Sequence, residues 1–414
     1  MLARRKFILA GTGLLLSLSM PLLAQARVKE VVGIVHVFGD GARLDTLSIA
    51  YDTEVSRVHP HDFKVHGRVV QEVYISQDIW GENHHASGHF VILKLKEAKP
   101  LLESIQHHKP QAHPQRKFIA GGKPEHTLKL QIPTMLLKIK GRTLGLARVS
   151  YPIVEDFKPF VFEDQALQRT LPYHLFIPQS KDKLPLVLFM HDAGVVGDLK
   201  RATLLQGLGA LIWAHPKEQA KRPCYVLAPQ YNEIVVDDNS NASPMLDVTM
   251  HLVKELCQKY PIDPSRIYTT GQSMGCMMSI AMLIKYPHFF AGAFLVAGQW
   301  KASLCGPLVH DRLWILVSQD DLGAYPAQTA IVEKLEREGV KVAKAVWDGR
   351  WDQAHFMQAC TEMMAQNAPI NYAVLKKGSL PSRDKMSVHR GTWQVAYNIE
   401  PIRAWLFKQT LKNV

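Results

Sequence analysis

Residues 267–287 combine a short apolar segment, the motif Gly271-Gln272-Ser273-Met274-Gly275 and a run of small and apolar residues. This order predicts a strand, a tight turn and a helix, with Ser273 at the turn. The turn leaves no room for side chains two residues away, which explains both glycines. The helix N-terminus would point at the serine oxygen, where its N–H groups and dipole stabilise a developing oxyanion. The motif therefore predicts a nucleophilic serine, with the Met274 N–H as one oxyanion donor.

A serine hydroxyl is a weak nucleophile, so the chain must also supply a base and a group that orients the base. Asp320 and Asp321 directly follow the apolar segment 313–317. An acid at the end of a buried strand is well placed for the orienting role. The residues alone leave both aspartates open, with Asp348 and Asp352 as later alternatives.

Two histidines are candidates for the base. His389 lies between the last predicted strand, 371–375, and the last predicted helix, 400–411. His355 follows another strand but lies within a predicted amphipathic helix, 352–366. A loop position after the last strand is the usual place for such a base, so the sequence favours His389 in a loop and keeps His355 as the alternative.

A second oxyanion donor is expected after an early strand. The apolar segment 186–190 is followed by His191-Asp192-Ala193-Gly194, a sequence able to expose backbone N–H groups. Asp192 and Ala193 are therefore predicted to join Met274 in an oxyanion hole.

The periodicity divides the chain into two folded parts. Residues 27–160 contain several short β-branched segments separated by glycine-rich turns, which predicts a small all-β sandwich. From residue 161 to 414, strands alternate with helices, which predicts a mostly parallel sheet flanked by helices. With the serine motif, this alternation predicts an α/β-hydrolase fold. The expected strands are 171–177, 186–190, 224–229, 267–270, 292–296, 313–317, 342–346 and 371–375, and the expected helices are 245–259, 274–286, 327–338, 352–366 and 400–411. In the sandwich, residues 128–139 form one of the expected strands.

Residues 1–26 have the pattern of a cleaved export signal. Arg4, Arg5 and Lys6 precede an apolar run, and Ala24-Gln25-Ala26 ends it. The paired arginines also resemble a twin-arginine signal. We expect an exported protein, periplasmic or secreted. The 414 residues include only five cysteines, too few for a disulfide scaffold.

The formal net charge is +12, and basic residues are concentrated near the C-terminus. This charge favours either a solubilising surface or weak attraction to anionic envelope surfaces. No nucleic-acid-binding module is recognisable, so nucleic acid is not an expected partner. Histidines are frequent in the β-rich part, among them His107, His108 and His113, but their spacing matches no metal-ligand pattern. Neither a metal nor an organic cofactor is expected.

The chain resembles secreted α/β-hydrolase esterases, often described as predicted peptidases, that carry an N-terminal immunoglobulin-like domain. The resemblance rests on the serine motif, on 184–191, 224–230 and 262–268, and on Asp321-Leu-Gly-Ala-Tyr-Pro326 and His389-Arg-Gly-Thr-Trp393. It implies a triad of Ser273, Asp321 and His389. The family commonly has H-G-x-G where this chain has His191-Asp192-Ala193-Gly194. A carboxylate at Asp192 would repel an oxyanion if it faced the site.

These features predict an exported serine hydrolase that cleaves esters of small molecules or polymers through an acyl-enzyme. A serine peptidase or amidase with the same triad is one alternative, and a noncatalytic binding protein on the same scaffold is another. Residues 231–244 are expected to form a loop over the site, or else an ordinary surface loop. We expect the β-rich part to pack on the hydrolase part and shape the site entrance. The oligomeric state and the pairing of the cysteines stay open.

Overall fold

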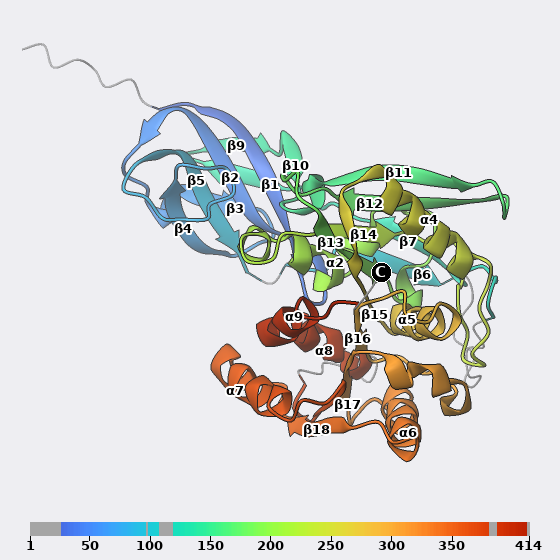
Figure 1. The fold of residues 1–414 in the computed structure, drawn as a ribbon. Helices are drawn as coiled ribbons and strands as arrows, with labels where there is room; N and C mark the ends of the chain where they lie inside the picture. Colours follow the sequence, from blue (N-terminus) through green and yellow to red (C-terminus); the bar gives the residue numbers. More distant parts are fainter. Residues whose placement is uncertain (1–25, 97, 107–118, 381–386, 412–414) are drawn as a thin grey trace, which may run out of the picture.

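The computed structural model describes residues 26–96, 98–106, 119–380 and 387–411. The predicted export signal and the loop histidines at 107, 108 and 113 lie outside these ranges. Figure 1 shows two parts, an N-terminal β-rich domain in blue and a larger domain in which helices surround a sheet.

The N-terminal domain has a five-stranded sheet in the order β10-β1-β2-β5-β4 and a three-stranded sheet in the order β3-β8-β9. Their inward side chains, such as Leu47 and Val91 in one sheet and Val65 and Leu137 in the other, are buried in a common core. Burial of alternate residues explains the β-branched composition of these segments. The strands are β1 (Val28–Phe38), β2 (Gly41–Val55), β3 (Phe63–Val65), β4 (Val70–Ser76), β5 (Gly88–Leu95), β8 (Leu136–Ile139), β9 (Arg142–Gly145) and β10 (Arg148–Ser150).

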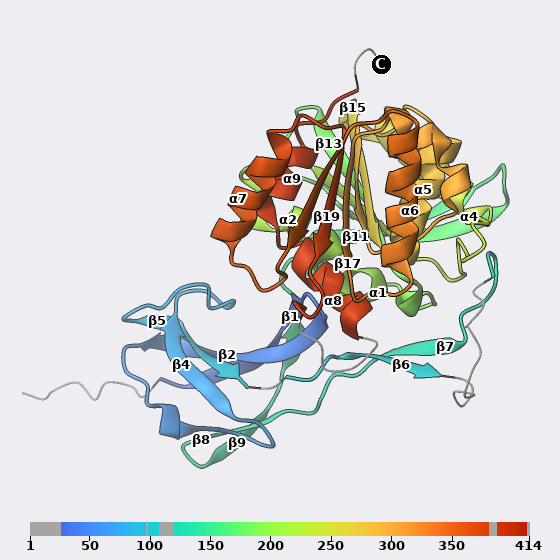
Figure 2. The same ribbon diagram turned by 90° about the horizontal axis from the view of Figure 1, so that it is seen from below.

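The prediction of a single strand over residues 128–139 was wrong. The segment forms two strands, β7 (His126–Leu130) and β8, because Pro133 between them has no N–H to donate to a ladder. β7 pairs with β6 (Leu102–Gln106) in a separate two-stranded ribbon. This ribbon leaves the sandwich and runs beside the larger domain (Figure 2). We call β6, β7 and residues 119–125 the arm.

The larger domain is built on a nine-stranded sheet in the order β11-β12-β14-β13-β15-β16-β17-β19-β18. β11, β12 and β14 pair antiparallel, and the rest of the sheet is parallel. The expected domain division at 160/161 falls within β11, all of which pairs with β12. The strands are β11 (Phe157–Asp164), β12 (Arg169–Phe176), β13 (Leu184–Met190), β14 (Tyr225–Pro229), β15 (Ile262–Gln272), β16 (Gly292–Val296), β17 (Leu313–Ser318), β18 (Val342–Trp347) and β19 (Ile370–Leu375).

Helices cover both faces of this sheet, so its central strands are buried on both sides and consist almost entirely of apolar residues. One face is covered by α4 (Met245–Lys259), α5 (Met274–Lys285) and α6 (Ala324–Arg337). The other carries α2 (Leu208–Ala214), α7 (Gln353–Met364), and α9 (Glu400–Leu406) (Figure 2). The short helices α1 (Ala202–Leu205) and α3 (Pro216–Gln219) flank α2.

The region around His389 differs from the prediction. His389 lies in a helix, α8 (Ser387–Ala396), and not in a loop. The helix forms because Thr392, Trp393 and Ala396 recur at helical spacing and are buried against the domain.

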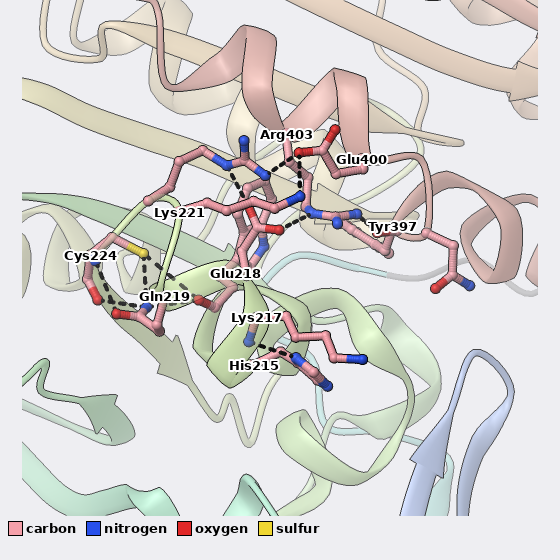
Figure 3. Close-up of polar contacts among 12 residues, drawn as sticks. His215, Lys217, Glu218, Gln219, Lys221, Cys224, Tyr397, Glu400 and Arg403 are labelled. Carbon is pink, nitrogen blue, oxygen red and sulfur yellow. Dashed lines mark hydrogen bonds and ion pairs between the residues drawn. The ribbon is translucent and has the colours of Figure 1, made fainter. Parts of the chain in front are cut away.

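A cluster of charged side chains fixes the end of α8 and the start of α9 against α3 (Figure 3). The buried carboxylate of Glu218 accepts hydrogen bonds from Arg222 Nε at 2.5 Å and Arg403 Nε at 3.0 Å. Arg222 also donates to Glu400 at 2.6 Å, and Arg403 donates to the Tyr397 carbonyl at 2.6 Å. Because buried charges require partners with defined geometry, this cluster restricts how the C-terminal helices pack.

All five cysteines are unpaired in the structure. None of the helices within the described ranges is long and apolar enough to cross a membrane.

Candidate active site

Ser273 lies between β15 and α5 in a conformation that is rare for a residue with a side chain. Its φ and ψ are 52° and −119°. Such strain persists only where the surrounding structure enforces it, and it is common at functional sites. A β-carbon on Gly275 would lie 1.9 Å from the Met190 carbonyl oxygen, and one on Gly271 would lie 2.5 Å from Gly275 C. Both glycines are therefore required by the close approach of the turn to β13.

The imidazole of His389 lies between Ser273 and Asp321. His389 Nε2 is 2.9 Å from Ser273 Oγ, and His389 Nδ1 hydrogen-bonds to Asp321 Oδ2. Because the carboxylate can only accept, Nδ1 carries the proton and Nε2 is free to accept the one on Ser273. The Trp393 ring packs nearly perpendicular to the imidazole, at 5.0 Å between centroids. This contact helps to fix the ring orientation.

Asp321 follows β17, and its side chain is buried. The N–H groups of Gly323 and Ala324 donate to Asp321 Oδ1 at 3.3 and 3.0 Å. Burial alone would raise the pKa of Asp321, but the hydrogen bond from His389, the attraction of this imidazole when it is protonated and these two N–H groups lower it below its usual value. The carboxylate is therefore held in its charged form beside His389.

The alternative candidates for the acid and the base form hydrogen bonds or ion pairs with other partners. Asp320 accepts a hydrogen bond from the Gly378 N–H at 2.6 Å, and Asp348 pairs with Arg350. His355 is exposed on α7 and pairs with Asp352 at 2.7 Å. None of these side chains forms a hydrogen bond with Ser273 in the described part of the chain.

The carboxylate of Asp192 is bound to its own loop. It accepts from the Gly194 N–H at 2.7 Å and from Gln272 Nε2 at 3.3 Å. Asp192 thereby caps the short 3-10 turn η3 (Ala193–Val195). Ala193 and Met274 line the pocket beside Ser273, whereas Asp192 is not among its lining residues. The carboxylate thus caps its own turn and is not part of the pocket wall.

His191 supports the same loop from behind. It is fully buried, and burial lowers its pKa. Its Nδ1 donates to the Asp192 carbonyl at 2.8 Å, and its Nε2 accepts from the Tyr231 N–H at 3.0 Å. A neutral imidazole satisfies both contacts. His191 thus connects the Asp192–Ala193 turn with the start of the 231–244 loop.

A pocket of about 260 Å³ opens beside Ser273. The 231–244 loop contributes Val236 and Asp238 to its wall. Sequence reasoning identified this loop but not these two residues, and it missed Gln299 after β16. The pocket is lined by Ala193, Val236, Asp238, Ser273, Met274, Met277, Ala297, Gly298, Gln299, Asp321, Gly323, Ala324 and His389. Among the described residues, no group of three or more His, Cys, Asp or Glu side chains could hold a metal ion.

Comparison with known families identifies the N-terminal domain. Residues 30–132 match the profile of the esterase Ig-like N-terminal domain. The domain is immunoglobulin-like, as predicted. The crystal structure of a thermostable esterase superposes with a TM-score of 0.72 at 23% identity, covering 92% of this chain and 100% of that one. This likeness confirms the predicted order of an immunoglobulin-like domain followed by an α/β-hydrolase fold.

Curated relatives match over shorter stretches. Poly(3-hydroxyalkanoate) depolymerase C of Paucimonas lemoignei is 45% identical over 47 residues, which are 11% of each protein. Acetylxylan esterase A of Aspergillus awamori is 24% identical over 131 residues, which are 30% of this chain and 41% of the esterase. The chain therefore spans less than half the length of either relative.

Proposed function

We propose that the protein is a serine hydrolase that cleaves carboxylic ester bonds. The observation that carries the proposal is the continuous hydrogen-bonded series Ser273–His389–Asp321 at the wall of a pocket. A strained serine next to a neutral imidazole nitrogen is the arrangement that activates a hydroxyl as a nucleophile.

In the proposed reaction, Ser273 Oγ attacks the ester carbonyl while His389 Nε2 accepts its proton. The N–H groups of Met274 and Ala193 stabilise the negative oxygen of the tetrahedral intermediate. His389 then donates the proton to the leaving alcohol, and an acyl-enzyme remains on Ser273. Water, deprotonated by His389, releases the acid. Asp321 orients the imidazole and stabilises its charged form throughout.

Cleavage of esters, as opposed to amides, is supported by the named relatives and by the esterase domain family of residues 30–132. The substrate class is a small-molecule or polymer ester. The proposal includes export, which is supported by the basic, apolar and Ala-x-Ala pattern of residues 1–26.

Labelling of the purified protein by a fluorophosphonate, followed by peptide mapping, tests the proposal. We expect one adduct, on Ser273, that is absent in Ser273→Ala and forms at least about 100-fold more slowly in His389→Ala. His355→Ala is the matched control, because this exposed histidine also pairs with an aspartate, and it should label at the normal rate.

Turnover is then measured on matched pairs of aryl esters and anilides. Faster ester cleavage supports the proposed function, and preferential anilide cleavage would instead support an amidase. The absence of any adduct on a folded protein would refute the hydrolase proposal and favour a binding protein.

A further inference from the structure

Asp238 brings a carboxylate to the mouth of the pocket beside Ser273. The residue is exposed and lines the pocket, and its Oδ1 accepts a hydrogen bond from Gln299 Nε2 at 2.6 Å. It forms no ion pair with any described residue. The pocket wall contains no lysine or arginine. Asp238 therefore places a negative group at the mouth of the pocket in a chain whose formal net charge is +12.

The backbone around Asp238 is held by its neighbour Asp237. Oδ1 of Asp237 accepts from the N–H groups of Asn239 and Asn241 at 2.9 and 3.0 Å, and Oδ2 accepts from Asn241 Nδ2 at 3.1 Å. The hydroxyl of Ser240 accepts from the Lys301 N–H at 2.9 Å. These bonds hold the backbone on either side of Asp238, and the hydrogen bond from Gln299 Nε2 holds its carboxylate.

The N-terminal domain supports the same loop through the arm. The Gly121 N–H donates to the Ile234 carbonyl at 2.7 Å, and the Ile234 N–H donates to the Gly122 carbonyl at 2.8 Å. The Ala120 N–H donates to Asp237 Oδ2 at 3.4 Å. Two domains therefore hold the segment that carries Asp238. Because the segment is already ordered, ligand binding loses little free energy to ordering it, and the side chain can discriminate between ligands.

We propose that Asp238 is a specificity-determining residue that favours esters with a positive charge near the scissile bond and disfavours esters with a negative charge there. The inference rests on the proposed ester hydrolysis and adds the charge class of the substrate. A fixed carboxylate without a cationic partner attracts a cation in the adjacent pocket and repels an anion. Because Asp238 is exposed, water and salt weaken the effect to that of a surface ion pair.

The test compares rates on three aryl esters of similar size, in which the acyl group is neutral, bears a quaternary ammonium or bears a carboxylate. A second series carries the same charges on the alcohol. In Asp238→Asn, we expect the cationic-to-neutral ratio of kcat/KM to fall about three- to fivefold in at least one series, and the anionic-to-neutral ratio to rise similarly. Asp238→Glu keeps the charge and should keep the preference. Asp182→Asn makes the same charge change at an exposed site outside the pocket wall and should leave both ratios unchanged.

Salt provides a measurement on the unaltered protein. The cationic preference should diminish at about 0.5 M salt, where the Debye length is only a few ångströms, while neutral ester turnover changes little. Ratios that are the same in the unaltered protein and in Asp238→Asn, in both series, would overturn the inference while leaving ester hydrolysis intact. Failure to hydrolyse the neutral esters, with no adduct at Ser273, would instead overturn the proposed function.

Discussion

The effect of Asp192 depends on the partners of its carboxylate. The sequence places a carboxylate where the esterases that it resembles are expected to have glycine, directly beside the expected oxyanion donors. In the structure, the Gly194 N–H and Gln272 Nε2 bind that carboxylate and orient it within its own turn. Its effect on the site is therefore to order the backbone that presents the Ala193 N–H.

Replacing Asp192 by alanine should loosen this turn. Loss of a cap of this kind costs about 1 kcal/mol. If the oxyanion contact loses a similar amount, kcat on a neutral ester should fall about fivefold with little change in KM. We expect kcat to change and KM to stay nearly constant because the oxyanion contact forms mainly in the transition state. Steady-state kinetics of Asp192→Ala would measure it, with Asp182→Ala as the control. An increase in KM at constant kcat would show that Asp192 acts on substrate binding instead.

At the scale of elements, α8 is held from both sides. The charged cluster of Figure 3 fixes the segment that follows it. The β1–β2 turn of the N-terminal domain packs against the helix itself. A β-carbon on Gly39 in that turn would lie 2.9 Å from Gln394 Cα. Gln394 lies little more than one helical turn beyond His389, so a shift of the helix also moves the imidazole.

We therefore predict that Gly39→Ala displaces α8 and slows fluorophosphonate labelling of Ser273 about tenfold or more, because small displacements of catalytic groups reduce rates strongly. Gly145→Ala is a control in the same domain, since a β-carbon added there would have no atom within 4 Å and its φ is not in the left-handed region. An unchanged labelling rate in a folded Gly39→Ala protein would show that this contact does not position His389.

Most elements of the larger domain could be predicted because a parallel sheet buried on both faces requires apolar strands separated by amphipathic helices. The helix around His389 could not, because Gly391 and a polar preceding segment resemble a loop, and it is burial of Trp393 that favours a helix. Asp238 and Gln299 gave no recognisable pattern, since polar loop residues look alike whether they face solvent or a pocket. That Ser273, Asp321 and His389 act together in catalysis stays a prediction for the labelling experiment to test.

The molecule as a whole should lose stability in mild acid, and His174 in β12 is one cause. Burial, with a smaller contribution from Arg201, lowers its pKa to about 4. An unfolded histidine titrates near pH 6.5, so between these values the unfolded chain binds a proton that the folded chain does not. Stability therefore falls as the pH decreases from about 6.5 to about 4, by up to about 3 kcal/mol for this residue. The buried His191 acts in the same direction.

His174→Gln should reduce this loss. We expect the difference in unfolding free energy between pH 7 and pH 4 to shrink by as much as about 3 kcal/mol relative to the unaltered protein. Urea unfolding followed by tryptophan fluorescence measures it, because all tryptophans except Trp80 lie in the larger domain. His61→Gln, at a position where the side chain is 79% exposed, should leave the difference unchanged. If His174→Gln lost as much unfolding free energy between pH 7 and pH 4 as the unaltered protein, other groups would be the cause of the acid sensitivity.

In the proposed mechanism, the position of α8 also determines when Ser273 becomes reactive. His389 follows Ser273 by 116 residues and Asp321 by 68, and its helix packs on a turn from the beginning of the folded chain. Most of the sheet can form before α8 docks, but Ser273 then lacks the base that we propose for it. Contacts between such distant segments form slowly. During refolding, the reactivity of Ser273 should thus recover later than the secondary structure. Its recovery would report the docking of α8, the last of these contacts between distant segments to form.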